Sequence, residues 1–168
     1  MSFYPKLGYL IFGSRLRRLS EYFLAEVNKV YAQSGIAFDA SWFPLFYLLS
    51  EGKQLTLMDI SQELEVSHSA VSQLIANLKG KGLVTTTRCA EDGRRQLVEL
   101  TRKGAALLNQ VLPVWKAIGE AMEGLVTEDP QSRKILEAIG AVERSVTEDP
   151  LSARILRAMD PKAKTIPS

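Results

Sequence analysis

The sequence is poor in the side chains that most enzymes and metal sites use. It contains one cysteine, Cys89, and one histidine, His68, among 168 residues. A lone cysteine excludes an internal disulfide and agrees with a reducing compartment, and one histidine without a nearby carboxylate cluster does not make a metal site. Because a glycine-rich phosphate loop and a histidine beside a serine nucleophile are also missing, we expect no enzymatic activity, no metal and no cofactor.

Long apolar runs and a strong charge of one sign are missing as well. No apolar stretch is long enough to span a bilayer and the start of the chain lacks a signal-peptide pattern, so we expect a cytoplasmic protein without a membrane span. The net charge is +2. Residues 53–104 hold eight Lys or Arg against six Asp or Glu, and residues 105–168 hold eight against nine. Basic charge is therefore local rather than spread over the whole chain.

The segment from Leu55 to Gly104 carries the most informative pattern. Thr56 stands before an apolar-periodic run and Asp59 follows three residues later, an acidic form of the capping box that begins a helix. The run closes before Ser67, which can cap a second helix that starts at His68. Two short helices in this order predict a helix-turn-helix.

The second of these helices combines an apolar face with a face of short polar side chains. Helical spacing predicts burial of Val71, Leu74, Ile75 and Leu78. The opposite face offers hydroxyls and amides that can hydrogen-bond base edges, and its small side chains let a helix enter the major groove. We therefore predict a DNA recognition helix that ends near Gly80. The residues of its polar face are Ser69, Ser72, Gln73 and Ala76, with Asn77 on the flank.

A predicted β-hairpin follows the recognition helix. The segment from Leu83 to Thr101 is rich in β-branched residues on both sides of Asp92-Gly93, a dipeptide that favours a tight hairpin turn. Arg94 and Arg95 come directly after it, where guanidinium groups can contact the DNA backbone or the minor groove. The alternative is that an exposed hairpin carries charge for solubility alone. The order of elements predicts a mainly α fold with a small β-hairpin wing, a winged helix-turn-helix.

The predicted contacts to duplex DNA come from both the recognition helix and the wing. His68, at the helix start, either contacts a phosphate or is simply exposed to solvent. Gln73 prefers adenine if it reads a base. The predicted DNA-binding residues are Ser67, His68, Ser69, Ser72, Gln73, Asn77, Lys79, Arg88, Arg94 and Arg95.

Over residues 43–104 these motifs resemble the MarR family of bacterial transcriptional regulators. The resemblance implies a homodimer that binds a palindromic operator, commonly as a repressor, and that a small molecule often releases. Ala70 and Gln73 stand where the family commonly has Thr and Arg, which indicates a different operator. The matching positions are Ser69, Val71-Ser72, Gly82-Leu83-Val84, Asp92-Gly93-Arg94 and Leu100-Thr101-Arg102-Lys103-Gly104.

A narrower resemblance covers residues 13–49 and the Leu112-Pro113-Val114-Trp115 motif. These segments are similar to the regulator half of proteins that fuse a MarR-type domain to a GNAT acetyltransferase. Too few residues follow for an acetyl-CoA-binding domain, so we expect no acetyltransferase activity. Two alternatives to a DNA-binding regulator remain: a winged-helix module that binds another protein through its tail, and a detached regulatory partner of a separate acetyltransferase.

Amphipathic helices flank the predicted DNA-binding segment. Apolar spacing predicts a long helix over residues 7–34 and a second helix over residues 41–50. Another long helix is predicted to start at Thr101, and Pro113 predicts a kink in it. Its apolar stripe is wider than packing against one neighbouring element needs, which indicates an interface. We expect an N-terminal dimerisation helix (1–40), a DNA-binding domain (41–104), C-terminal dimerisation helices (105–160) and a frayed tail (161–168).

The C-terminal region holds an internal repeat. Residues 126–139 and 146–159 are offset by twenty positions and share nine of fourteen residues. Each copy has Asp before Pro, at Asp129-Pro130 and Asp149-Pro150, which predicts the N-cap and first residue of a short helix. We expect the duplication to lengthen the dimer interface, and a surface for a ligand or another protein is the alternative.

Aromatic residues predict an effector site. They would line an apolar cleft between the dimerisation helices and the DNA-binding lobe, where Arg15 or Arg18 would pair with the carboxylate of a small aromatic molecule. Ordinary core packing is the alternative for each of them. The candidate effector-binding residues are Arg15, Arg18, Tyr22, Trp42, Phe46, Tyr47 and Trp115, with Phe23 and Phe43 beside them.

Cys89 precedes the predicted wing turn. Its neighbour Arg88 can lower the pKa of the thiol and favour the reactive thiolate, as in a redox sensor. Because the chain has no second cysteine to resolve an oxidised intermediate, we favour an incidental thiol over a sensor.

Overall fold

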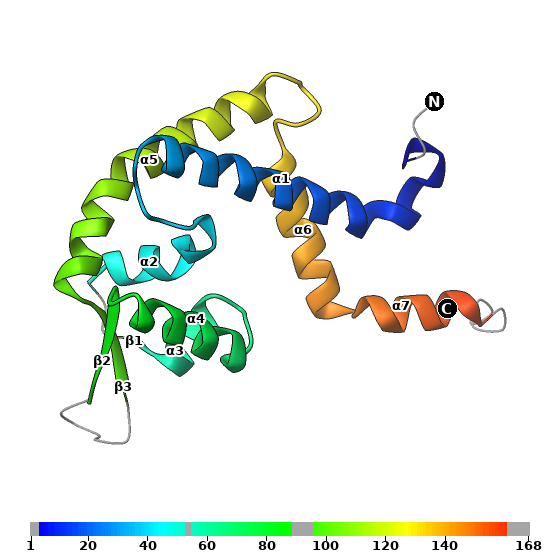
Figure 1. The fold of residues 1–168 in the computed structure, drawn as a ribbon. Coiled ribbons are helices and arrows are strands. Elements are labelled where there is room, and N and C mark those ends of the chain that lie inside the picture. The colour runs from blue at the N-terminus through cyan, green and yellow to red at the C-terminus, as the bar shows by residue number, and fades with distance from the viewer. Residues whose placement is uncertain (1–3, 53–54, 89–95, 161–168) are drawn as a thin grey trace. The chain divides into compact units, whose positions relative to one another are not determined.

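The computed structural model describes residues 4–52, 55–88 and 96–160 of the chain. They form a mainly helical structure with one small antiparallel sheet (Figure 1), which confirms the predicted fold class. The chain divides into two compact units, Met1–Ile118 and Gly119–Ser168. The elements are η1 (Tyr4–Ile11), α1 (Phe12–Gln33), η2 (Ala40–Trp42), α2 (Phe43–Ser50), β1 (Leu55–Thr56), α3 (Leu57–Glu63), α4 (His68–Gly80), β2 (Val84–Arg88), β3 (Gln96–Leu100), α5 (Arg102–Thr127), α6 (Ile135–Glu148) and α7 (Leu151–Met159).

Helices α3 and α4 form the predicted helix-turn-helix. A capping box begins α3: Thr56 Oγ1 accepts from the Asp59 amide at 3.2 Å, and Asp59 Oδ2 accepts from the Thr56 amide at 2.8 Å. The turn contains Glu65 in a left-handed conformation at φ 52°. Ser61 holds this turn, since its carbonyl accepts from the Val66 amide at 3.2 Å and its hydroxyl donates to the Val66 carbonyl at 2.7 Å. Helix α4 begins at His68, as predicted.

The sheet is antiparallel, with the strand order β1-β3-β2. Strands β2 and β3 form the predicted hairpin, in which Val84 pairs with Leu100 and Thr86 pairs with Val98. Strand β1 pairs with the other edge of β3, so β3 is central and the Val98 side chain is fully buried. The predicted turn at Asp92-Gly93 lies outside the described residues.

One apolar core joins the helices and the sheet of the first unit. Of the predicted inner face of α4, Val71, Ile75 and Leu78 are buried, and Leu74 is half-buried. They belong to a cluster with buried side chains from every neighbouring element. The largest fully buried members are Tyr31 (α1), Leu45 and Phe46 (α2), Ile60 (α3), Val71 and Leu78 (α4), Val98 (β3) and Val111 (α5).

The N-terminal helix is shorter than predicted. Residues 4–11 form a 3-10 segment, and Gly8, with φ 52° and ψ −127°, breaks the helical path, so α1 begins at Phe12. The second helix is also shorter, because Asp39 caps a 3-10 turn over residues 40–42 and α2 starts only at Phe43. Helix α5 begins at Arg102, one residue after the predicted start, and the helix continues through Pro113, where the sequence predicts a kink.

The prediction for the repeat was wrong in its first copy. Asp129-Pro130 does not begin a helix: Asp129 Oδ1 accepts from the Gln131 amide at 2.7 Å in a turn, and α6 starts only at Ile135. In the second copy, Pro150 takes the N-cap position of α7, one residue before the helix. There the Asp149 carboxylate pairs with Arg154 at 3.3 Å and with Arg157. The first copy has Glu137 in place of Arg157, so this pairing is not possible there.

The described part of the second unit has no core of its own. Helices α6 and α7 contain no buried residue. Leu136, Leu156 and Met159 are 78%, 66% and 72% exposed. Apolar surface of this extent usually marks an interface with another molecule.

Gly104→Ala should destabilise the first unit. A Cβ at this position would lie 2.0 Å from the Leu83 carbonyl oxygen, and neither backbone can move away cheaply. We expect the free energy of unfolding, measured by urea denaturation, to fall by about 1–3 kcal/mol. Gly119→Ala is the matched control, because no atom lies within 4 Å of its added Cβ and a helical Gly→Ala change stabilises by up to about 1 kcal/mol. Equal stability of the two variants would contradict the close packing at Gly104.

Candidate nucleic-acid interface

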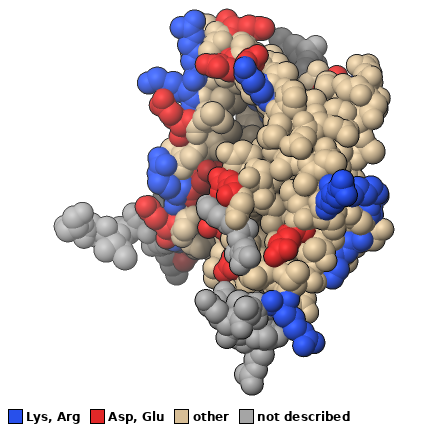
Figure 2. Space-filling view, turned by 90° about the vertical axis from the view of Figure 1, so that its left-hand side faces the viewer, with Lys and Arg blue, Asp and Glu red and all other residues tan. Residues whose placement is uncertain are grey.

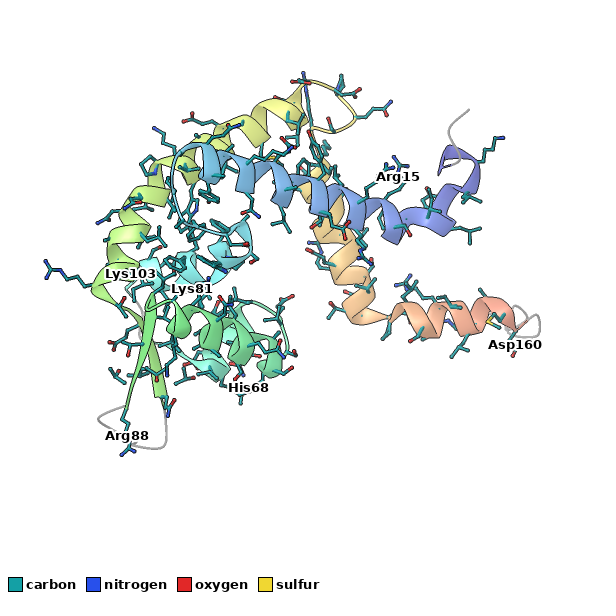
Figure 3. The ribbon with its side chains drawn as sticks, in the orientation of Figure 1. Arg15, His68, Lys81, Arg88, Lys103 and Asp160 are labelled. Carbon is teal, nitrogen blue, oxygen red and sulfur yellow. The ribbon has the colours of Figure 1, made fainter. Side chains whose placement is uncertain are left out.

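The polar face of α4 lies on the surface of the first unit. Ser69, Ser72 and Gln73 are exposed, and so are His68 and Asn77. Figure 3 places His68 at the start of the helix. The structure therefore brings five predicted contact residues together on one exposed helix, as a groove-reading helix requires.

Ser67 has a structural task in addition to its predicted DNA contact. Its hydroxyl accepts from the Ala70 amide at 3.3 Å and so caps the N-terminus of α4. The Ser67 and Ser69 hydroxyl oxygens also lie 3.0 Å apart, within hydrogen-bonding distance. These contacts fix the first turn of α4, the part of a recognition helix that meets base edges.

Gln73 and Asn77 also line a groove of about 520 Å³ beside α4. The groove brings them next to Ser41 and Lys81, two residues that were not among the predicted contacts. Ser41 comes from the turn before α2, so sequence spacing gave no sign of its position. Its hydroxyl donates to Asp39 Oδ1.

Of the four basic residues predicted to contact DNA, the structure describes Lys79 and Arg88. Lys79 at the end of α4 donates from Nζ to Thr86 Oγ1 at 2.9 Å, which ties α4 to β2. Arg88 is exposed at the end of β2 (Figure 3). Arg94 and Arg95, the predicted wing contacts, lie outside the described residues, and so does Cys89.

Charge on the molecular surface is mixed rather than uniform. On the face shown in Figure 2, basic and acidic side chains are interspersed with much uncharged surface between them. This agrees with a net charge of only +2. Attraction of a polyanion would therefore depend on the local cations of the helix-turn-helix and the wing.

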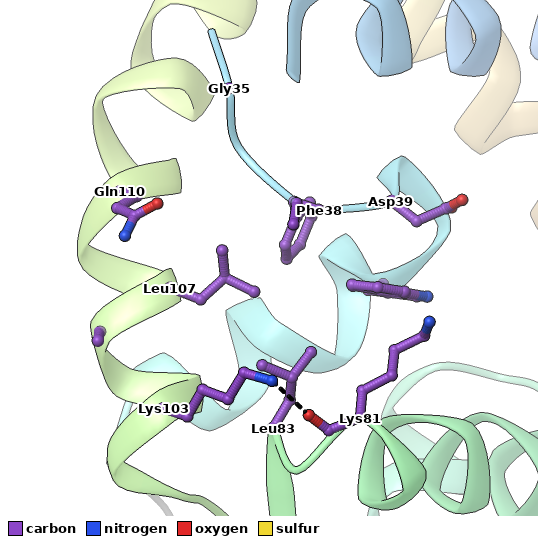
Figure 4. A pocket seen from close by; sticks show the side chains of 11 residues that line it. Gly35, Phe38, Asp39, Lys81, Leu83, Lys103, Leu107 and Gln110 are labelled. Atoms are coloured by element: carbon purple, nitrogen blue, oxygen red, sulfur yellow. Dashed lines mark hydrogen bonds between the residues drawn. The ribbon is translucent and has the colours of Figure 1, made fainter. Parts of the chain in front are cut away.

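A second cavity, of about 690 Å³, adjoins the C-terminal end of α4. Phe38, Trp42 and Leu107 supply apolar walls, and Lys81 and Lys103 supply two ammonium groups (Figure 4). Lys81 Nζ lies 5.4 Å from the centre of the Trp42 ring, within reach of a cation–π interaction. Asp39 is the single carboxylate among the lining residues. The cavity therefore combines an aromatic wall with a surplus of positive charge.

Three of the predicted effector residues surround Phe38, a residue that was not among those predicted, and a fourth joins them indirectly. The Phe38 ring centre lies 5.5 Å from that of Trp42, 5.0 Å from Phe46 and 6.1 Å from Trp115. Tyr47 joins through Trp115, at 6.2 Å. Phe46 is fully buried and serves the core, whereas Trp42 lines the cavity.

A partly buried hydrogen bond anchors this aromatic cluster. Trp115 Nε1 donates to the Tyr31 hydroxyl oxygen at 3.0 Å. Burial raises the pKa of the Tyr31 phenol above its ordinary value, and the hydrogen bond from Trp115 partly opposes this rise. Tyr31 is therefore neutral at physiological pH and acts as a fixed polar contact within an apolar cluster.

The other predicted effector residues lie elsewhere in the first unit. Tyr22 is exposed and its ring packs 5.9 Å from Phe23, both on α1. Arg15 and Arg18 are also on α1 and line neither of the two cavities described above. Figure 3 shows Arg15 well away from Lys81 and Lys103. Their role toward an effector stays a prediction.

Two further properties concern only the described part of the chain. None of its helices has the length and apolar character that a membrane crossing requires. It also contains no group of three or more His, Cys, Asp or Glu side chains placed to hold a metal ion.

The sequence and the fold of this chain are similar to those of known proteins. Residues 38–95 match the model of the MarR family. The match covers the helix-turn-helix and reaches into the wing. The chain is therefore similar to the MarR family over residues 38–95. The MarR family consists of DNA-binding regulators rather than enzymes, in agreement with the predicted lack of enzymatic function.

Individual relatives are more distant. An uncharacterised HTH-type transcriptional regulator of Bacillus subtilis, YdgJ, is 33% identical over 89 residues, which cover 49% of this chain and 52% of that protein. The chain thus matches about half the length of this curated relative. The DNA complex of MepR from S. aureus has a TM-score of 0.67 at 20% identity, over 81% of this chain and 97% of MepR. BpsR of Bordetella bronchiseptica has a TM-score of 0.61 at 24% identity, over 80% and 91%. These two likenesses establish the fold.

Ser67→Ala should lower the stability of α4, whereas Ser72→Ala should not. Loss of the N-cap hydroxyl costs about 1 kcal/mol in the free energy of unfolding. Ser72 is exposed on the same helix, and its replacement should stay within about 0.5 kcal/mol of the wild type. Urea denaturation of both variants measures this difference. Equal stability of the two variants would show that the Ser67 cap does not hold α4.

Proposed function

We propose that this protein is a homodimeric, sequence-specific DNA-binding regulator that acts in the cytoplasm, as a repressor, on a palindromic operator. The observation that carries the proposal is the exposed polar face of α4, set on a buried apolar face and followed by a two-stranded wing. In this arrangement α4 enters the major groove, where Ser69, Ser72 and Gln73 meet base edges. Arg94 and Arg95 contact the flanking backbone or minor groove.

The proposed dimer uses the flanking helices. Exposed apolar side chains are abundant on α1, at Phe12, Leu16 and Leu19, and on α6 and α7 of the second unit. Burial of these side chains against a second copy would remove apolar surface from water on both chains. Two recognition helices related by a twofold axis then read half-sites about 34 Å apart.

Selection from a randomised duplex pool near physiological salt should enrich a palindrome. Arg94→Ala should weaken binding to the palindrome and to other sequences alike, because a phosphate contact is lost. The salt slope, which is the slope of the logarithm of the binding constant against the logarithm of the salt concentration, should become smaller in magnitude by about one. Gln73→Ala should instead lose about 1–3 kcal/mol of discrimination at one base pair, because a base contact is lost. Equal loss on every sequence would refute the base-reading role of Gln73.

The same selection tests the alternatives. If folded, dimeric wild-type protein enriches no sequence, the regulator proposal fails. The chain would then be better explained as a protein-interaction module or as the partner of a separate acetyltransferase, and co-purification would identify what it binds.

We further propose that a small aromatic acid regulates DNA binding from the cavity beside α4. The Trp42 and Phe38 rings offer an apolar wall, and the Lys81 and Lys103 ammonium groups offer partners for a carboxylate. The BpsR structure concerns regulation of DNA binding by 6-hydroxynicotinic acid, a ligand of this chemical class. Arg15 and Arg18 would contribute only if a second copy brought them to the cavity.

Benzoate should alter the fluorescence of Trp42 and weaken DNA binding. The chain has two tryptophans, so Trp115→Phe leaves Trp42 as the single reporter on the cavity wall. Lys81→Met should weaken benzoate binding, because one ammonium partner is removed. Benzamide, which has the same ring without the charge, is the control ligand. A benzoate titration that changes neither Trp42 emission nor DNA affinity would count against an aromatic acid as effector.

A further inference from the structure

The C-terminal end of the recognition helix is held by the beginning of α5. Three successive carbonyl oxygens after α4 accept hydrogen bonds from two residues. Lys103 Nζ donates to the Lys81 carbonyl at 2.8 Å, and Thr101 Oγ1 donates to the Gly82 carbonyl at 2.6 Å. The Thr101 amide donates to the Leu83 carbonyl at 3.0 Å. We call these three contacts the α4–α5 clamp.

The clamp joins two backbones that are already in close contact. Gly104 packs so tightly that a Cβ would lie 2.0 Å from the Leu83 carbonyl oxygen. The Gly104 amide donates to Thr101 Oγ1 at 3.0 Å, so the same hydroxyl caps α5 and binds the end of α4. Leu83 is buried. Movement of the first turn of α5 would therefore be passed on to the end of α4.

Lys103 has an unusual electrostatic position. It stands in the first turn of α5, where the helix dipole is positive and a cation is unfavourable. Its ammonium group instead reaches the Lys81 carbonyl at the C-terminal end of α4, where the dipole is negative and a cation is favourable. The side chain is exposed, so core packing does not explain its placement. Figure 4 shows this contact at the edge of the cavity.

We propose that Lys103 is a positioning residue for DNA recognition, which fixes the angle between α4 and α5 without touching DNA. This inference rests on the proposed function. In the proposed dimer α5 leads from the clamp toward α6 and α7, which carry exposed apolar side chains, so that angle would set the distance between the two recognition helices. Loss of the Lys103 contact releases one of the three points of the clamp and lets α4 take a range of angles.

Lys103→Met tests this role, with Arg102→Met as the matched control. Arg102 lies on the same turn of α5 and is also exposed, so both variants lose one positive charge from the same place. Binding is measured on the selected palindrome and on versions with one base pair added or removed between the half-sites. For Lys103→Met we expect about tenfold weaker binding to the selected spacing, because DNA binding must then restrict an angle that the clamp already restricts in the wild type, at an entropic cost comparable to ordering one residue. The preference for that spacing should shrink while the salt slope stays unchanged.

Three results would overturn the role of Lys103. A salt slope lower by about one would identify a phosphate contact. An unchanged spacing preference would show that the lysine does not set the position of α4. Equal losses for Lys103→Met and Arg102→Met would assign the effect to charge alone. Lys103→Arg, which keeps a long cationic donor, should restore the spacing preference.

Amide hydrogen exchange provides a readout that needs no DNA. The Gly82 and Leu83 amides donate to the carbonyls of Lys79 and Leu78, at the end of α4. Their exchange should be faster in Lys103→Met and unchanged in Arg102→Met, because only the former loosens the clamp. Equal exchange in both variants would reject the clamp itself. If exchange responds but the wild type selects no DNA sequence, the clamp exists and the proposed function fails, together with the role of Lys103 in recognition.

Discussion

The exposed face of α4 depends on the burial of its opposite face. Val71, Ile75 and Leu78 insert into a core shared with α2, α3, β3 and α5, and this leaves the hydroxyl and amide side chains outside. The Ser67 cap fixes the start of the helix and the α4–α5 clamp fixes its end. A helix held on one face and at both ends loses little further conformational entropy when it meets a ligand, which favours a specific interaction over a loose one.

Local sequence signals predicted the helix-turn-helix accurately because the interactions that form it are local. The Thr56–Asp59 capping box and the Ser67 cap connect residues three positions apart, and the apolar periodicity of α4 matched its buried face. The hairpin was predicted from β-branched residues and from a turn dipeptide. The capping, periodicity and β-branched signals are each complete within a few neighbouring residues, so tertiary context did not override them, whereas the turn dipeptide lies outside the described residues.

The prediction was less successful where contacts join distant segments. Phe38, at the centre of the aromatic cluster, stands in a loop without periodicity, and Lys103 looked like an ordinary charge on a helix. The contact between Lys103 and Lys81 spans 22 positions, and no spacing rule reaches so far. Arg15 and Arg18 were chosen for their charge, but the described cavity draws its cations from Lys81 and Lys103.

The repeat of residues 126–139 and 146–159 gives the C-terminal region a way to change in length. Each copy begins within the last residues of a helix, and in both copies the helix ends just before Asp-Pro. Recombination between the two copies would remove or add a block of twenty residues and leave residues 1–118 unchanged. The tail can therefore change length in whole helical segments. Under the proposed function, such changes would alter the proposed dimer surface of α6 and α7 and leave the helix-turn-helix unchanged.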